Sequence, residues 1–300
     1  MENIVKLEQV TKKFGKKTAV NGVSLTIEKG TTVAILGPNG AGKTTTISMM
    51  LGLLEPTSGT VKVFDKSPKE IAVRNRIGAM LQETSVLDML KVREFIEMFR
   101  SYYTSPLSME ELIALTGFKE DELKKRANKL SGGQKRRLGF ALALAGNPDL
   151  IFFDEPTVGL DITARRNFWE RVEILKLQGK TIIFTTHYLQ EADDFSERII
   201  LFNNGEIITD GKPDEIKRNI ATRSVSFQTD DKEVIGLLQS FDDVIRCYEK
   251  DGRIYVVTSN TDAVIAGIFR HGVDANDIAI EQGRLEEVFE HLTSGSKEAI

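Results

Sequence analysis

Features typical of secreted, membrane-spanning or nucleic-acid-binding proteins are scarce in this sequence. Its 300 residues include one cysteine, Cys247, which excludes an internal disulfide and most thiolate metal sites and fits a reducing compartment. The longest apolar runs, such as residues 138–145, are far shorter than the roughly 20 residues of a membrane span, and the N-terminal MENIVKLEQV lacks the apolar core of a signal peptide. With 40 basic against 44 acidic residues, the net charge of −4 offers no electrostatic footprint for nucleic acid. We therefore expect a chain that does not itself cross a membrane and has no nucleic-acid partner.

What the sequence does contain is the composition of a folded, enzyme-like protein. Hydrophobic residues make up 41% and charged residues 28%, and both shares are ordinary for a globular chain. The length exceeds that of a typical single domain. We therefore expect one large domain followed by a smaller one.

The first domain, expected over residues 1–220, reads as α/β with two additions. It is expected to begin with an antiparallel pair of strands at 4–10 and 23–27, joined by the polar turn 12–17. Helical spacing without a convincing strand predicts a helical insert at about 83–145.

The central strands of this domain are short and apolar. The strand TTVAIL, residues 31–36, leads directly into a glycine-rich loop, and helical spacing then runs over 44–54. The dipeptide Asn204-Gly205 favours a closing hairpin. The other strands expected here are 77–81, 149–153, 181–185, 199–202 and 206–209.

The pattern changes near residue 220 and predicts a second domain over 221–300. Its elements follow the order βαββαβ, which is the ferredoxin-like plan. A last helix is expected at 285–292. The expected strands are 224–229, 244–249, 254–258 and 277–281, and the expected helices are 232–241 and 261–271.

The loop GPNGAGKT has the composition of a phosphate-binding site. Its glycines allow successive backbone N–H groups to converge on phosphate oxygens, Lys43 adds charge at the β and γ phosphates, and Thr44 can ligate Mg²⁺. Ordinary residue usage predicts roughly 0.01 chance matches in a chain of this length. The expected nucleotide contacts are Gly37, Pro38, Asn39, Gly40, Ala41, Gly42, Lys43, Thr44 and Thr45.

The segment LIFFDE, residues 150–155, is an apolar strand that ends in two carboxylates. A parallel strand would place them at the carboxyl edge of the sheet, beside the phosphate loop. Asp154 can then hold the Mg²⁺ shell, while Glu155 can polarise an attacking water. The alternative is a simple helix N-cap followed by Pro156.

The segment LSGGQ, residues 130–134, opens a predicted helix. It offers an anion the Ser131 hydroxyl, the N–H groups of Gly132 and Gly133, and the positive end of the helix. Taken alone, it could be only a helix start. Together with the glycine loop and the FFDEP segment, it makes residues 1–220 resemble the ABC ATPase family, whose signature it is.

The resemblance implies a P-loop ABC-type ATPase domain, with an antiparallel β subdomain and a helical insert, that binds ATP and Mg²⁺. It implies a Mg²⁺-sensing role for Gln82, a contact with the opposite subunit for Asp161 and a switch role at the γ phosphate for His187. It also implies adenine stacking by Phe14, although a lone aromatic is usually packing. The residues implied in catalysis are Lys43, Gln82, Glu155 and His187, and those implied at the metal are Thr44, Gln82 and Asp154.

In this family two ATPase domains face each other head to tail. The resemblance therefore implies that Ser131, Gly132, Gly133 and Gln134 bind the ATP held by the Lys43 of a second chain, in a homodimer or in a heterodimer with a sister ATPase. Two other features have simpler explanations. Phe168 and Trp169 are expected to pack in the core, and the basic run 135–137 to pair with acidic neighbours.

The exporter branch of the family, for drugs, antibiotics and lipids, is the one that residues 154–161, LSGGQKRRL and the late segment 284–289 resemble. This implies a separate permease and a peripheral location at the cytoplasmic face of the membrane. An importer ATPase with a ligand-sensing C-terminal domain and a soluble, non-transport ABC ATPase remain alternatives. Residues Val86, Leu87, Met89 and Leu90 could contact the permease or could equally be helix core.

Overall fold

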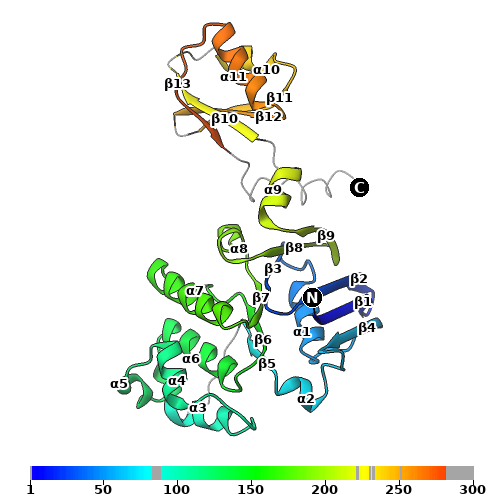
Figure 1. Ribbon diagram of the computed structural model, residues 1–300, viewed down its shortest axis with the longest axis vertical. Coiled ribbons are helices and arrows are strands. Elements are labelled where there is room, and N and C mark those ends of the chain that lie inside the picture. Colours follow the sequence, from blue (N-terminus) through cyan, green and yellow to red (C-terminus); the bar gives the residue numbers. More distant parts are fainter. Residues whose placement is uncertain are drawn as a thin grey trace. The chain divides into compact units, whose positions relative to one another are not determined.

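The computed structural model describes residues 2–82, 89–220, 223–229, 231, 234–250 and 252–281. The chain forms two compact units, Met1–Gly211 and Lys212–Ile300, each described by itself below (Figure 1). The expected boundary near 220 would have left the helix α9 (Pro213–Ile220) in the first unit, whereas this division assigns it to the second.

A six-stranded sheet forms the centre of the first unit, in the order β5-β6-β7-β3-β8-β9. All its pairings are parallel except that of β9 with β8. Every residue of β3, β6 and β7 is buried, as expected for parallel strands covered on both faces. The bounds are β3 (Thr32–Leu36), β5 (Ile77–Met80), β6 (Leu150–Asp154), β7 (Thr181–Thr185), β8 (Arg198–Asn203) and β9 (Glu206–Gly211).

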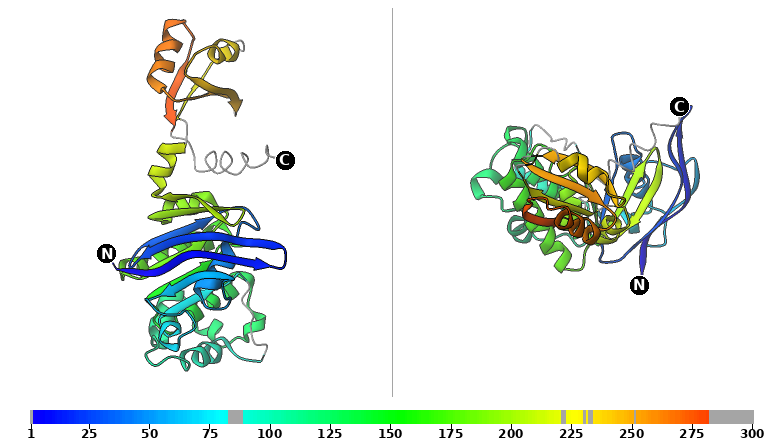
Figure 2. Two further views of the ribbon diagram at one scale, coloured as in Figure 1. Left: turned by 90° about the vertical axis from the view of Figure 1, so that its right-hand side faces the viewer. Right: turned by 90° about the horizontal axis from the view of Figure 1, so that it is seen from above.

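A second, antiparallel sheet has the order β2-β1-β4, with β1 (Asn3–Phe14), β2 (Lys17–Glu28) and β4 (Ser58–Val63). The expected turn at 12–17 is present but shorter: it is confined to residues 15–16, and the strands extend to Phe14 and from Lys17, which pair with each other. The pair contains several register shifts, and residues 13–18 around the turn are exposed. The left view of Figure 2 shows this long hairpin in blue. Strand β4 was not predicted, since its sequence SGTVKV begins with turn-forming residues.

One apolar core joins the antiparallel sheet, the parallel sheet and the helix α1 (Lys43–Met50). It includes Leu7 from β1, Ile47 from α1 and Phe152 from β6, all at most 1% exposed. The core therefore fixes the position of the loop between β3 and α1. The helices that complete this part are α2 (Ile71–Arg74), α7 (Ile162–Leu177) and α8 (Leu189–Phe195).

The helical insert contains α3 (Val92–Arg100), α4 (Met109–Thr116), α5 (Glu120–Leu123), the 3₁₀ turn Ala127–Lys129 and α6 (Gly132–Leu144). The end of α6 is apolar and packs into the unit through Phe140, whose ring stacks on that of Phe153 at 5.6 Å. Phe168 contacts the same rings, and the indole of Trp169 stacks on Phe195 at 4.5 Å. The expectation that Phe168 and Trp169 are core residues is confirmed.

The second unit contains the expected βαββαβ order. Its antiparallel sheet runs β11-β12-β10-β13, so the first and third strands are central, as in a ferredoxin-like fold. Phe227, Val256 and Ile268 are fully buried in its core. The expected last helix at 285–292 and the motif at 284–289 lie outside the described residues. The bounds are β10 (Arg223–Gln228), α10 (Val234–Gln239), β11 (Val244–Lys250), β12 (Arg253–Thr258), α11 (Thr261–Arg270) and β13 (Asn276–Glu281).

Candidate active site

The phosphate loop follows β3 and ends at α1, where the sequence predicted it. Gly42 is the N-cap of α1 at φ 107°, and Gly37 has φ 149°. A Cβ on Gly37 would lie 2.3 Å from the Phe202 carbonyl oxygen, and one on Gly42 would lie 2.6 Å from the Ala19 carbonyl oxygen. These glycines are therefore needed for packing against β8 and β2, a reason that sequence reasoning did not supply.

Lys43 lies inside the loop and is 7% exposed. Its ammonium donates to the carbonyl oxygens of Gly37 at 2.7 Å and Pro38 at 3.1 Å. Burial lowers the pKa of Lys43, and the negative charges of Glu155 and Asp154 oppose that effect. The loop thus surrounds a fixed positive charge. On its outer side, Asn39, Gly40 and Thr44 are exposed, where a nucleotide can reach them.

Asp154 ends β6 beside the loop, as predicted, and is 3% exposed. Its Oδ2 lies 3.5 Å from the Thr44 hydroxyl oxygen, and its Oδ1 accepts a 2.6 Å hydrogen bond from the Thr185 hydroxyl. A hydroxyl and a carboxylate are the hard oxygen ligands that Mg²⁺ prefers. Among the described residues there is no cluster of three or more carboxylate, His or Cys side chains placed to hold a metal.

Glu155 has the left-handed backbone conformation, with φ 48°, which is strained for a residue other than glycine. Its backbone N–H donates to the Thr185 hydroxyl at 2.9 Å. Its carboxylate accepts a 2.9 Å hydrogen bond from the Gln82 amide and lies 3.6 Å from Nδ1 of His187. The structure therefore brings together Lys43, Thr44, Gln82, Asp154, Glu155 and His187, which come from four separate segments.

Two residues near these carboxylates were missed by sequence reasoning. The Thr185 hydroxyl joins Asp154 to the Glu155 backbone. Burial lowers the pKa of the Arg136 guanidinium, and the charges of Glu155 and Asp154 oppose that shift, so this cation lies within electrostatic range of both carboxylates. A threonine at the end of the neighbouring parallel strand was the available signal for the first, whereas nothing in the sequence distinguished Arg136 within its basic run.

The signature segment begins α6 with a reciprocal cap. The Ser131 hydroxyl accepts from the Gln134 N–H at 3.3 Å, and the Gln134 side chain accepts from the Ser131 N–H at 3.0 Å. The Gln134 amide also donates to Glu122, which forms a 2.6 Å ion pair with Arg137. The helix-start interpretation is thus correct for Ser131 and Gln134. It leaves Ser131 and Gly132 exposed and accessible to a second chain.

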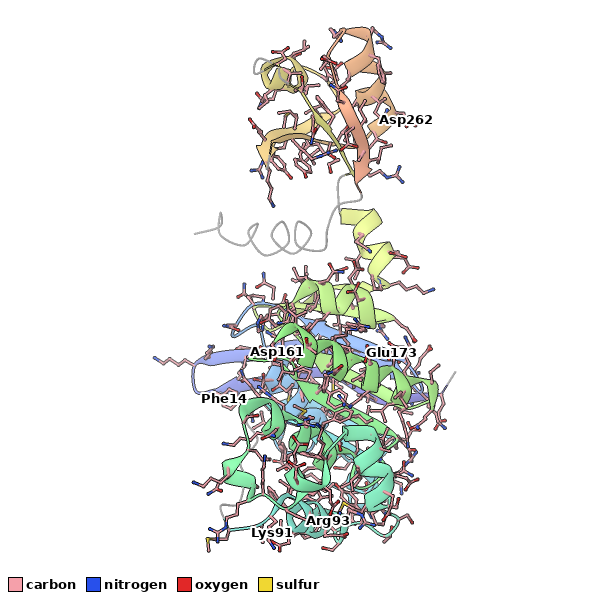
Figure 3. All side chains as sticks on the ribbon, turned by 90° about the vertical axis from the view of Figure 1, so that its left-hand side faces the viewer. Phe14, Lys91, Arg93, Asp161, Glu173 and Asp262 are labelled. Atoms are coloured by element: carbon pink, nitrogen blue, oxygen red, sulfur yellow. The ribbon has the colours of Figure 1, made fainter. Side chains whose placement is uncertain are left out.

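Two further predicted site residues, Phe14 and Asp161, are labelled in Figure 3. Phe14 lies at the end of β1 and is 51% exposed, with the Lys12 ammonium 5.2 Å from its ring centroid, so it is not a core residue. Asp161 caps α7, where its Oδ1 accepts from the Ala164 N–H at 2.8 Å. Its described hydrogen bond is therefore within its own helix.

Comparison with known proteins identifies the family. Residues 20–158 match the ABC transporter family. The chain is 32% identical to the Nod factor export ATP-binding protein I of Ralstonia nicotianae, over 97% of this chain and 94% of that protein. It is 30% identical to the daunorubicin resistance ATP-binding protein DrrA3 of Streptomyces coeruleorubidus, over 99% of this chain and 98% of that one.

The fold is likewise that of a solved cassette. A dimeric post-hydrolysis structure of the ATP-binding cassette MJ0796, bound to ADP and Pi, is 33% identical, covers 70% of this chain and 98% of its own, and superposes with a TM-score of 0.63. No helix in the described part of the chain is both long and apolar enough to span a membrane. The chain therefore belongs to the ABC transporter family and is an ATP-binding, ATP-hydrolysing subunit.

Proposed function

We propose that this subunit powers export of a drug, antibiotic or lipid-like compound through a separate permease. The observation that carries the proposal is that Lys43, Asp154 and Glu155 lie together at one edge of the parallel sheet. These are the groups that ATP hydrolysis requires. The direction of transport is supported by two relatives that align over nearly the whole chain. One is named a Nod factor export ATP-binding protein and the other a daunorubicin resistance ATP-binding protein. The permease would hold the subunit at the cytoplasmic face of the membrane.

In the proposed reaction the phosphate loop and Lys43 bind the β and γ phosphates. Thr44 and Asp154, with Gln82 nearby, would hold a Mg²⁺ ion, which supplies charge neutralisation at the phosphates when bound. The Glu155 carboxylate orients and polarises the attacking water, and the Gln82 amide fixes that carboxylate. His187, next to Glu155, contacts the γ phosphate. Phe14 stacks on the adenine.

The proposed working unit is a head-to-tail dimer, in which Ser131 to Gly133 of one chain bind the ATP held by the other. The exposure of Ser131 and Gly132 at the start of α6 supports this arrangement, as does the dimeric state of the related cassette. Asp161 would contact the opposite chain from the start of α7. Whether the second chain is a copy of this one or a sister ATPase depends on the transporter.

Size-exclusion chromatography with light scattering tests this dimer. Glu155→Gln keeps the shape of the side chain but removes the carboxylate, so we expect the variant to bind MgATP, to hydrolyse it slowly and to accumulate as a dimer. The double variant Lys43→Ala, Glu155→Gln is the matched control, because it loses the phosphate charge and should stay monomeric. A Glu155→Gln variant that binds ATP and remains monomeric would contradict the head-to-tail scheme.

Permease contact is proposed for the segment after Gln82. Met89 is 76% exposed, and Leu90 is half-buried. Val86 and Leu87 lie outside the described residues. Met89→Asp with Leu90→Asp should reduce co-fractionation with permease-containing membranes, whereas Leu177→Asp, at the 86% exposed end of α7, should not. Unchanged membrane association of the double variant would remove the contact.

A second candidate function is an import subunit whose C-terminal domain senses a ligand. The observation in its favour is the four-stranded ferredoxin-like sheet of the second unit. Vesicles that contain the permease and this subunit distinguish the two directions. Export predicts that ATP on the side of this subunit drives a fluorescent amphiphilic drug away from that side, while ATP-driven uptake toward it favours the importer.

A further inference from the structure

A buried carboxylate, that of Glu191 on α8, joins two loops of the active site. Glu191 is 4% exposed, and both of its oxygens are engaged. Oε1 accepts a 2.7 Å hydrogen bond from the Thr157 hydroxyl, and Oε2 accepts a 2.7 Å hydrogen bond from the Thr186 hydroxyl. Thr157 and Thr186 are themselves only 1% and 2% exposed. One side chain therefore ties the turn after β6 to the loop after β7.

The two threonines lie beside the residues to which we assign hydrolysis. Thr157 follows Glu155 in the turn after β6, and Thr186 directly precedes His187. The Thr186 hydroxyl also accepts a 3.0 Å hydrogen bond from the Tyr188 backbone N–H. This bond spans His187, so the backbone is held on both sides of that residue. Across these loops, Oε1 of Glu155 and Nδ1 of His187 are 3.6 Å apart. That pair therefore spans the same two loops that Glu191 joins.

Arg165 provides the counter-charge for Glu191. Its Nε lies 3.5 Å from Oε1 of Glu191, and its guanidinium stacks on the Tyr188 ring at 3.9 Å. The Tyr188 ring in turn lies 4.3 Å from the ring of His187. Arg165, near the start of α7, therefore contacts Glu191 and also packs on Tyr188, which packs on His187 in the loop after β7.

We propose that Glu191 is a positioning residue for ATP hydrolysis, which sets the distance and orientation between Glu155 and His187. Burying a carboxylate costs desolvation free energy that a well-packed apolar residue would avoid, and Glu191 is 4% exposed, so a purely structural contact has no need of a charge here. A carboxylate can accept two hydroxyl hydrogen bonds in one plane while it pairs with a cation, which no apolar side chain can do. This inference rests on the proposed roles of Glu155 and His187.

The test is a double-mutant cycle between Glu191 and His187 in the full-length chain. Glu191→Gln removes the charge and one acceptor oxygen but keeps the volume. We expect kcat for ATP to fall at least 10-fold while KM changes less than about 3-fold. The reason is that the loops after β6 and β7 carry the residues assigned to hydrolysis, whereas ATP is bound by the phosphate loop, which this change leaves intact. In the His187→Ala background the same change should lower kcat less than 2-fold, because the geometry it disturbs is already lost. Glu191→Asp should recover part of the loss.

Thr116→Val is the stability control. It removes another fully buried threonine hydroxyl, which donates to the Leu112 carbonyl oxygen in α4, away from these loops. The control should lower the melting temperature without lowering kcat. If Glu191→Gln lowers kcat equally in both backgrounds, or only as far as the control does, Glu191 is not a positioning residue. If kcat is unchanged in Glu191→Gln but lowered in His187→Ala, only this inference is overturned. If kcat is unchanged in His187→Ala, the proposed role of His187 is overturned and this inference with it.

Discussion

The side-chain amide of Gln82 donates a 2.9 Å hydrogen bond to Oε2 of Glu155, across the ends of the neighbouring strands β5 and β6. A fixed donor holds the carboxylate in one orientation, from which it can accept a proton from water. Gln82 and Glu155 therefore form one hydrogen-bonded pair of predicted site residues.

Replacement of Gln82 tests this relationship. Gln82→Ala should lower kcat about 10-fold, since one hydrogen bond that positions Glu155 is lost. Gln82→Glu should lower kcat further, because the donor is lost and two negative charges within hydrogen-bond distance repel each other, which displaces the Glu155 carboxylate. Steady-state ATPase rates measure both. Asn21→Ala, which removes a 2.7 Å amide–carboxylate hydrogen bond to Glu206, is the matched control and should leave the rate unchanged. Wild-type rates in Gln82→Glu would contradict the assignment.

Acid should weaken the helical insert through Glu122. Burial pushes the pKa of this carboxyl up, but hydrogen bonds from the Lys119 backbone N–H, Arg137 and Gln134 outweigh that effect and bring the pKa down from 4.5 to about 2. A depressed pKa stabilises the folded state above the unfolded value and loses this contribution as pH falls through the folded value. We expect Glu122→Gln to lower the free energy of unfolding by ~2 kcal/mol at pH 7.

Urea unfolding at several pH values measures that difference. The gap between wild type and Glu122→Gln should shrink as pH falls from 4.5 toward about 2. Glu120→Gln is the matched control on the same helix, because its ion pair with Arg93 is exposed and should contribute less than ~0.5 kcal/mol. A gap that is independent of pH would show that the charge of Glu122 is not responsible.

The thiol of Cys247 should resist alkylation. It is buried in the core of the second unit, and burial raises its pKa to about 11. Because the thiolate is the nucleophile, labelling by iodoacetamide at pH 8 should be at least ~100-fold slower than in urea-unfolded protein. The native rate should continue to rise between pH 9 and 11. Rapid native labelling at pH 8 would indicate that this core opens readily.

Phe14 is testable as the adenine contact. Phe14→Ala should weaken ATP binding about 5- to 150-fold, the range expected for loss of one base–aromatic stack of ~1–3 kcal/mol, while Phe14→Trp should retain it. Binding of inorganic tripolyphosphate, which has no base, should be unaffected. Tyr102→Ala removes another exposed aromatic, 67% exposed, and serves as the control. Equal losses for ATP and tripolyphosphate would mean that Phe14 supports the fold and not the base.

The strands and the phosphate loop were predictable because their signals are local. Short apolar runs such as 150–154 and 181–185 are recognisable as strands without knowledge of their partners, and both are fully buried in the sheet. The turn of the β1–β2 hairpin was expected over residues 12–17 but occupies only 15–16, because the polar residues on either side look like a turn although they pair as strand. Strand β4 was missed, since its conformation depends on pairing with β1 and not on its own sequence.

By itself the sequence determined the chemical groups of this site: a glycine loop with Lys43, two carboxylates at the end of an apolar strand, and a serine and two glycines at a helix start. Only the tertiary structure decided which of them meet. It places the Phe202 carbonyl against Gly37, the Gln82 amide on Glu155 and the Glu191 carboxylate between Thr157 and Thr186. Residue type and spacing act over a few positions of the chain, whereas these contacts join segments whose approach depends on sheet order and core packing.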